Sequence, residues 1–294
     1  MKKHFITFLL LTLATLAFED SSVMAVSKGV KKYDVETVAY NTPVHEETIK
    51  TIRAKVTVMN KKLRSPNDIK IFTKNKIKPI NYTNTVSLKK LEVSEKKQKF
   101  FHMLLPAILI SKANLKLKRK RVLSLRSTPE EELREDDRDF LEELYKRYKT
   151  RDIKKLANRL KTHPVSIILA QAAIESAWGE SRFFKKGNNI FGMWSYNRHE
   201  PRIRAKGKRK GKAIYVKKYA TLSDAIDDYF VVIGRGAYKS FRKQRNITDN
   251  PLRLVNYLVN YCELREKYTK KLKHFIVYNK LRKFDKFEID EQYL

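Results

Sequence analysis

Glu175 and Trp178 are the residues of this chain whose types and spacing could do chemistry, in the stretch A-Q-A-A-I-E-S-A-W-G that starts at Ala170. Apolar residues recur before Glu175 at spacings of three and four, which predicts a helix and places Glu175 at the edge of its buried face. Burial disfavours the charged form of a carboxyl group, so its pKa should rise towards neutrality. A neutral carboxylic acid beside an indole can donate a proton to the leaving oxygen of a glycosidic bond.

The helix that carries Glu175 has signals at both ends. Pro164 suits the first helical position, and Gly179 can end the helix. By position alone, however, Glu175 is more typical of a solvated side chain in the last turn of a core helix. The catalytic interpretation therefore depends on the residues that surround it in the sequence.

The order of residues around Glu175 is more informative than Glu175 itself. The stretch continues as E-S and is followed at residues 188–193 by N-N-I-F-G-M. Together these residues resemble the glucosaminidase domain of glycoside hydrolase family 73, whose members cut the glycan strands of bacterial peptidoglycan. The stretch E-K-K-Q-K-F-F at residues 95–101 resembles the Bax-type subgroup of bacterial glucosaminidase-domain proteins. The resemblance runs from about residue 94 to about residue 279, and it implies a mostly α, lysozyme-like helical domain with a small β-hairpin lobe beside the cleft.

The resemblance also implies catalytic roles. Glu175 matches the family's general acid, and Tyr261 matches a tyrosine that faces the cleft and supports catalysis, although Cys262 and Glu263 depart from the usual run. Tyr268 is expected to pack. Family members often supply a second carboxylate from the hairpin lobe to position water, which makes Glu200 the candidate base. Three other carboxylates compete for that role: Glu180, Asp224 and Asp227.

Predicted substrate contacts surround these groups. In the family, the Asn-x-x-Gly segment lines the floor of the cleft near the acetamido sugar, which implies that Asn189 and Gly192 lie near substrate. Gly192 also suits a turn that needs positive φ. Trp194 and Tyr196 either stack on sugar faces or pack on the scaffold. The predicted substrate-binding residues are Gln171, Trp178, Asn189, Phe191, Gly192, Trp194 and Tyr196.

A single convincing carboxylate leaves the mechanism open. Inversion needs a base about 6.5–9.5 Å from the acid, and direct retention a nucleophile at about 5–5.5 Å. Attack by the substrate's own acetamido oxygen, or lytic transglycosylation, needs only Glu175. The resemblance favours hydrolysis of β-1,4 N-acetylglucosaminyl bonds. The alternatives are a lytic transglycosylase that uses the same Glu175 and a non-catalytic protein that binds cell wall or lipopolysaccharide.

The charge of the chain predicts an anionic partner. Lys and Arg number 65 against 32 Asp and Glu, which gives a formal net charge of +33. We expect peptidoglycan glycan strands as the partner, anionic envelope polymers on the basic surface, no dedicated nucleic-acid partner, and a monomer. Cys262 is the only cysteine, expected to be buried, and the six His show no metal-ligand spacing, so we expect no cofactor and no metal.

The start of the chain predicts export. A basic first segment precedes an apolar run, Phe5 to Phe18, that is too short for a comfortable membrane span. We expect a signal peptide cleaved after Ala25; the alternative is an uncleaved anchor that tethers the protein. Either outcome places the remainder in the periplasm or cell envelope.

Five segments follow from these patterns. They are a signal peptide at 1–25, a basic, weakly structured extension at 26–86, a helical scaffold at 87–150, the glucosaminidase domain at 151–280 and a charged tail that frays at 281–294. A helix is expected from Glu46 to Lys61. Another helix is capped by Ser94 and kinked or split at Pro106. Further helices are expected from Thr128, from Asp152 to Lys161, from Thr221 and from Asn250, and a β-hairpin or loop within residues 198–218.

Overall fold

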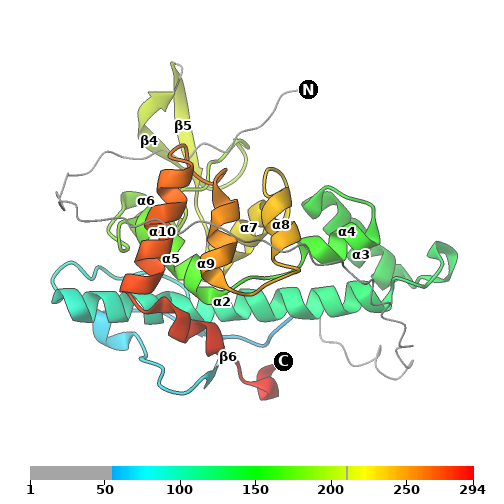
Figure 1. The fold of residues 1–294 in the computed structure, drawn as a ribbon, viewed down its shortest axis with the longest axis horizontal. Coiled ribbons are helices and arrows are strands. Elements are labelled where there is room, and N and C mark those ends of the chain that lie inside the picture. Colours follow the sequence, from blue (N-terminus) through cyan, green and yellow to red (C-terminus); the bar gives the residue numbers. More distant parts are fainter. Residues whose placement is uncertain (1–54, 210) are drawn as a thin grey trace, which may run out of the picture.

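The computed structural model of this protein describes residues 55–209 and 211–294 (Figure 1). The predicted signal peptide, its cleavage after Ala25 and most of the helix predicted from Glu46 lie outside the described residues. The described part of the chain is mostly α, as predicted, and its strands form three two-stranded sheets.

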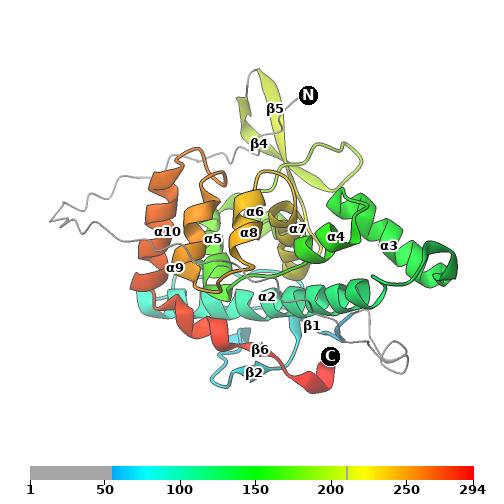
Figure 2. The same ribbon diagram turned by 45° about the vertical axis from the view of Figure 1, so that its right-hand side comes forward.

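Helix α2 (Val93–Ser124) forms a base on which most other helices lie (Figures 1 and 2). Every side chain from Phe100 to Ser111 is buried. The helix runs unbroken through Pro106, so the predicted split is wrong: burial on all sides compensates for the backbone hydrogen bond that proline removes. The N-cap is Glu92, without a side-chain cap, and the prediction of Ser94 is also wrong.

By length and composition α2 could cross a membrane. Most of its apolar window, 78%, is buried inside this protein, however, as is usual for a core helix. Its apolar character is thus satisfied by contacts with the rest of the chain.

Two scaffold helices lie near the C-terminal end of α2. Helix α4 (Ile153–Arg159) begins as predicted, because the Asp152 side chain accepts a hydrogen bond of 2.9 Å from the Lys155 amide. The helix predicted from Thr128 starts later: residues 130–132 form one 3-10 turn, and α3 is Glu135–Tyr148. The acidic first turn and basic last turn of α3 complement the helix dipole.

The central helix α5 (Val165–Ser176) lies between α2 and α10 (Glu266–Tyr278). Beyond it come the short helix α6 (Arg182–Gly187) and the predicted hairpin, an antiparallel pair of β4 (Arg202–Arg209) and β5 (Lys212–Lys217). The hairpin projects from the body on the side opposite α2 (Figures 1 and 2).

The remaining helices close the domain. Helix α7 (Leu222–Gly234) begins at the predicted cap, where Thr221 and Asp224 form a reciprocal capping box. Asn250 caps α9 (Pro251–Leu254) as expected. The elements between and after these are α8 (Lys239–Gln244) and the 3-10 helix η3 (Val255–Leu258).

The two outer segments of the described chain are folded onto the base. Strand β1 (Met59–Lys61) pairs with β3 (Ile80–Tyr82), and β2 (Lys76–Ile77) pairs with β6 (Glu288–Ile289), both in parallel. Three 3-10 helices accompany them, η1 (Pro66–Asp68), η4 (Leu281–Lys286) and η5 (Glu291–Tyr293).

This pairing corrects three predictions. Residues 55–86 are not weakly structured, since Leu63, Ile77 and Tyr82 are buried. Residues 281–294 do not fray, since Phe284 and Ile289 are buried as well. Residues 59–61, predicted as the end of a helix, form strand β1 instead.

Candidate active site

Glu175 lies in the last turn of α5, next to a sharp reversal of the chain. The helix ends at Ser176, earlier than predicted, and three successive residues with positive φ follow: Ala177 (51°), Trp178 (59°) and Gly179 (82°). The Ser176 hydroxyl donates to the Ala172 carbonyl at 2.6 Å and accepts from the Gly179 amide at 2.9 Å. This turn holds Glu175 at the end of a rigid, buried helix.

The carboxyl group of Glu175 is shielded and held by one tyrosine. Oε1 accepts a hydrogen bond of 3.0 Å from the Tyr268 hydroxyl on α10. Burial raises the pKa of Glu175 from 4.5 to about 7, against the opposing effects of the Tyr268 hydrogen bond and the Lys271 charge. The residue as a whole remains partly exposed. Glu175 can therefore exist as a neutral acid at neutral pH while solvent still reaches it.

The neighbour of Glu175 is thus a phenol, whereas the sequence suggested an indole. The Trp178 ring packs in an aromatic cluster with Phe100, Phe101 and Phe275, at centroid distances of 5.7, 5.4 and 5.2 Å. These contacts tie the turn after Glu175 to α2 and α10. Trp178 is partly exposed, so its predicted contact with substrate stays a prediction.

Two tyrosines of the site differ in their relation to Glu175. Tyr268, expected only to pack, donates to Glu175. Tyr261, expected to assist catalysis, is completely buried, and its ring stacks on Tyr268 at a centroid distance of 5.6 Å and an angle of 13°. Burial raises the pKa of Tyr268 well above 10, so its hydroxyl stays protonated and available as a donor.

Behind Tyr268 a buried polar chain leads into the core. Gln171 Nε2 lies 3.3 Å from the Tyr268 hydroxyl, and Gln171 Oε1 accepts from the Tyr229 hydroxyl at 2.7 Å. The Tyr229 hydroxyl also lies 2.8 Å from His163 Nε2. Gln171 is fully buried, which corrects its prediction as a substrate contact. No local pattern marks these pairs, because their members lie 58 to 97 residues apart.

The Asn-x-x-Gly segment forms a turn under the hairpin. Asn189 donates to the carbonyls of Met193 and Lys217 at 3.0 and 2.8 Å, and accepts from the Met193 amide at 2.9 Å. Phe191 is fully buried and stacks on Tyr229 at 4.4 Å. The side chains of Asn189 and Phe191 are buried and hold this turn in place, which corrects their prediction as substrate contacts. Gly192 has a φ of 64°, as predicted, and is partly exposed.

An aromatic surface lies at the foot of the hairpin. Trp194 bridges to Val216 of β5, and its ring centroid lies 6.1 Å from that of Tyr196, which is 76% exposed. The Arg209 guanidinium lies 5.4 Å from the centre of the Trp194 ring. Exposed, adjacent rings of this kind can stack on sugar faces.

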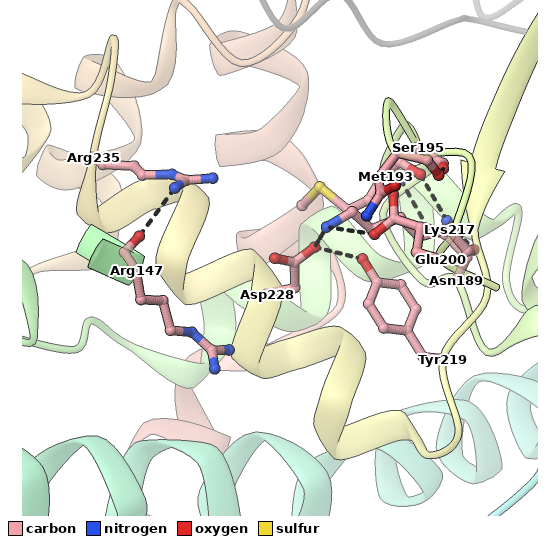
Figure 3. A network of polar contacts seen from close by, with 10 residues as sticks. Arg147, Asn189, Met193, Ser195, Glu200, Lys217, Tyr219, Asp228 and Arg235 are labelled. Atoms are coloured by element: carbon pink, nitrogen blue, oxygen red, sulfur yellow. Dashed lines mark hydrogen bonds and ion pairs between the residues drawn. The ribbon is translucent and has the colours of Figure 1, made fainter. Parts of the chain in front are cut away.

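Glu200 belongs to an ion-pair network between the hairpin and α7 (Figure 3). Lys217 Nζ lies 3.8 Å from Glu200 Oε2 and 2.9 Å from Asp228 Oδ2. Asp228 also accepts from the Tyr219 hydroxyl at 2.7 Å. The partial exposure of Glu200 leaves it open to solvent. Sequence reasoning missed Asp228, which lies on a helix face with no motif around it.

The competing carboxylates have other partners. Asp224 belongs to the capping box of α7, and Glu180 pairs with Lys185 at 2.5 Å. Burial raises the pKa of Asp227, and its hydrogen bond with Ser111 acts in the opposite direction. None of these contacts aims the carboxylate at Glu175.

Metal sites and cavities are the remaining candidate features of residues 55–209 and 211–294. Within these residues no three His, Cys, Asp or Glu side chains gather as a metal site. Cys262 is buried, as predicted. One cavity of about 360 Å³ lies between α2 and the C-terminal segment, lined by Lys112, Arg119 and Asp285 among others, away from Glu175.

The described residues form a mostly helical domain with a shielded acid, Glu175, and a hairpin lobe, which are the features that the resemblance to glycoside hydrolases implies. Residues 150–281 match the glucosaminidase family, described as mannosyl-glycoprotein endo-beta-N-acetylglucosaminidase.

Similar proteins cover only parts of this chain. The exo-glucosaminidase LytG of Bacillus subtilis is 34% identical over 89 residues, which are 29% of this chain and 32% of the relative. Protein Bax of Escherichia coli is 32% identical over 118 residues, 37% of this chain and 41% of the relative. The catalytic domain of the autolysin Auto of Listeria monocytogenes is 19% identical with a TM-score of 0.37, over 57% of this chain and 97% of that domain. The chain thus spans less than half the length of these two curated relatives.

Proposed function

We propose that this protein hydrolyses β-1,4 N-acetylglucosaminyl bonds in the glycan strands of peptidoglycan, with Glu175 as the general acid. The observation that carries the proposal is the partly buried Glu175 carboxyl, whose pKa of about 7 keeps a large fraction protonated at neutral pH. The glucosaminidase family match over residues 150–281 and the similarity to the exo-glucosaminidase LytG support the bond type.

The chemistry follows from the environment of Glu175. The protonated carboxyl gives its proton to the glycosidic oxygen as the bond to the sugar carbon breaks, which leaves an oxocarbenium-like sugar and a carboxylate. Tyr268, through its hydrogen bond, and Lys271, through its charge, both favour that carboxylate. The same groups therefore stabilise the charge that Glu175 acquires in the reaction.

Glu200 is the proposed base. Lys217 Nζ lies 3.8 Å from its Oε2, and Glu200 is partly exposed to solvent. Its position beside the hairpin fits a group that activates water. If Glu200 is dispensable, attack by the substrate's acetamido oxygen or lytic transglycosylation from Glu175 alone takes its place.

Substrate is proposed to bind along the foot of the hairpin. Trp194 and Tyr196 offer ring faces, and the partly exposed backbone at Gly192 lies between the buried Phe191 and Met193. Basic side chains on β4 and β5 suit anionic envelope polymers: Lys206, Lys208, Arg209 and Lys212. A peptidoglycan substrate places the proposed site of action in the cell envelope.

Digestion of purified sacculi by Glu175→Gln and Glu180→Gln variants tests the proposal. Glu175→Gln should remove lytic activity because an amide cannot donate the proton, whereas Glu180→Gln changes a carboxylate in the following turn and should retain it. Circular dichroism verifies that both variants fold. Mass spectrometry of the products separates reducing ends, expected of a hydrolase, from anhydro ends, expected of a transglycosylase. A folded Glu175→Gln variant with full activity would defeat the assignment, and a wild-type protein that binds sacculi without cutting them would favour the non-catalytic alternative.

A further inference from the structure

Three buried side chains connect Glu175 to His163 through four consecutive hydrogen bonds. The links are Tyr268 to Glu175 at 3.0 Å, Gln171 to Tyr268 at 3.3 Å, Tyr229 to Gln171 at 2.7 Å and His163 to Tyr229 at 2.8 Å. His163, Gln171, Tyr229 and Tyr268 are each no more than 3% exposed. Such a network is fixed by packing and shielded from competing water.

The amide of Gln171 fixes which group donates and which accepts in each hydrogen bond of this network. Its Oε1 can only accept and its Nε2 can only donate, so Tyr229 gives its hydrogen to Gln171 and Tyr268 receives one from Gln171. The Tyr229 oxygen must then accept from His163 Nε2, which carries the ring hydrogen. Tyr268, in turn, has its own hydrogen left for Glu175 Oε1.

The tautomer of His163 agrees with this direction. Nδ1 of His163 has no hydrogen-bond partner among the described residues. The opposite tautomer would place a buried, unpaired N–H at Nδ1, in a pocket formed by the rings of Tyr229, Phe230 and Phe241. Burial, with Arg245 and Lys112 acting in the same direction, holds the pKa of His163 well below 6.5, so the ring stays neutral near pH 7.

One carboxyl oxygen of Glu175 is therefore already in use as a hydrogen-bond acceptor. Oε1 already accepts the hydrogen of Tyr268, and the carbonyl oxygen of a neutral carboxyl group is a better acceptor than its hydroxyl oxygen. When Glu175 is protonated, the proton accordingly belongs on Oε2, the oxygen that Tyr268 leaves free. General acid catalysis needs the proton on the oxygen that faces the leaving group.

We propose that His163 is a positioning residue that acts through Tyr229, Gln171 and Tyr268 to place the transferable proton of Glu175 on Oε2. The catalytic meaning of this placement rests on the proposed function. The effect of His163 on the titration of Glu175 does not, and it can be measured whatever the reaction is.

Removal of the N–H donor of His163 should allow the hydrogen bonds of this network to reverse their donor and acceptor roles. In His163→Phe the Gln171 amide can turn over, and Tyr268 can then accept from a protonated Glu175. A hydrogen bond to the neutral form favours that form, so the pKa of Glu175 should rise by about half a unit. The new phenyl ring fits among rings that already surround His163 at 5.2 to 5.6 Å.

The experiment compares four single variants of the full chain: His163→Phe, Tyr229→Phe, Tyr268→Phe and, as a control, Tyr238→Phe. The Tyr238 hydroxyl is buried in the same aromatic cluster and has no hydrogen-bond partner among the described residues. Carbon-13 NMR of the glutamate carboxyls follows the titration of Glu175, assigned by its absence in Glu175→Gln. The other titratable groups that face it are Tyr238, Tyr261, Cys262, Tyr268 and Lys271.

The expected result is an upward shift in the first three variants and none in Tyr238→Phe. Activity on sacculi should show kcat reduced about threefold to tenfold with KM unchanged, and the alkaline limb of the kcat profile should move with the pKa. In a Tyr268→Phe background, His163→Phe should have no further effect, because the hydrogen-bond network between His163 and Glu175 is already interrupted.

Two outcomes overturn the proposal. One is a wild-type titration of Glu175 in both His163→Phe and Tyr229→Phe; Tyr229→Phe supplies this test if His163→Phe does not fold. The other is a shift that His163→Phe produces equally with and without the Tyr268 hydroxyl. Glu175→Gln separates these failures from failure of the proposed function: an inactive Glu175→Gln preserves the function while the positioning role falls, and an active one removes the function while the titration result stands.

Discussion

The Tyr268 hydroxyl and the Glu175 carboxyl meet at 3.0 Å across the contact between α10 and α5, although 93 residues separate them in the sequence. Two effects oppose each other at this contact. Burial raises the pKa of Glu175, and the hydrogen bond from Tyr268 lowers it, with burial dominant and a resulting pKa of about 7. The ionised form of Glu175 is therefore less stable in the folded chain than in water.

This shift predicts that Glu175→Gln stabilises the fold in a pH-dependent way. A carboxyl whose pKa rises from 4.5 to about 7 on folding costs no stability below pH 4.5, and the cost grows as the pH rises from 4.5 to about 7. At pH 8 the variant should be more stable by about 3 kcal/mol, and at pH 4 by little. Urea unfolding of both proteins at the two pH values measures the difference. Equal stabilisation at pH 4 and pH 8 would show that ionisation of Glu175 is not the cause.

The catalytic activity should fall as the pH rises, whereas the stability cost of ionising Glu175 grows as the pH rises. The protonated form of Glu175 is the proposed donor, so kcat should fall above about pH 7, tenfold for each further pH unit. Initial rates on solubilised glycan strands between pH 5 and 9 give the profile. A rate that climbs steadily to pH 9 would contradict the role of acid.

Local sequence patterns predicted the features that depend on near neighbours. The cap at Asp152, the capping box of Thr221 and Asp224 and the antiparallel hairpin all depend on residues a few positions apart. The position of Glu175 at the edge of an apolar helical face allowed either a raised pKa or a solvated side chain, and the packing of α10 against α5 decided for the raised pKa.

Long-range packing decided what the sequence left unpredicted. Helix period shows that Gln171 belongs near Glu175, yet not that it points inward to Tyr229. The partner of Glu175, Tyr268, comes from a helix whose placement depends on the whole fold. The parallel pairing of β2 with β6 joins residues about 200 positions apart, and neither strand has enough length to be predicted alone.

Glu200→Gln tests whether a second carboxylate takes part. If Glu200 activates water, the amide should lower kcat about a hundredfold or more with little change in KM. Asp228→Asn is the matched control, because it also removes one negative charge beside Lys217 without removing Glu200. The activity of the control should fall much less. Equal losses in the two variants would mean that the ion-pair network, rather than Glu200 as a base, supports activity.

Gly179→Ala should destabilise the turn that follows Glu175. Gly179 has a φ of 82°, and an added Cβ would lie 3.1 Å from the Phe184 ring and 3.4 Å from the Phe100 ring. Gly211 has a similar φ of 74° with nothing within 4 Å, so Gly211→Ala isolates the cost of the backbone conformation. We expect about 1 kcal/mol for Gly211→Ala and about 2–3 kcal/mol for Gly179→Ala, by urea unfolding. Equal values would show that the contacts with the two rings yield without cost.

Tyr196→Ala should weaken substrate binding without a change in the fold. The Tyr196 side chain is 76% exposed and lies beside Trp194, so its removal should alter stability by less than about 0.5 kcal/mol. Loss of one stacking contact of about 1 kcal/mol should raise KM about fivefold and leave kcat nearly unchanged. Tyr278→Ala removes another exposed tyrosine, 67% exposed at the end of α10 and stacked on His274, and should keep the wild-type KM. A KM that rises equally in both variants would place sugar binding away from the foot of the hairpin.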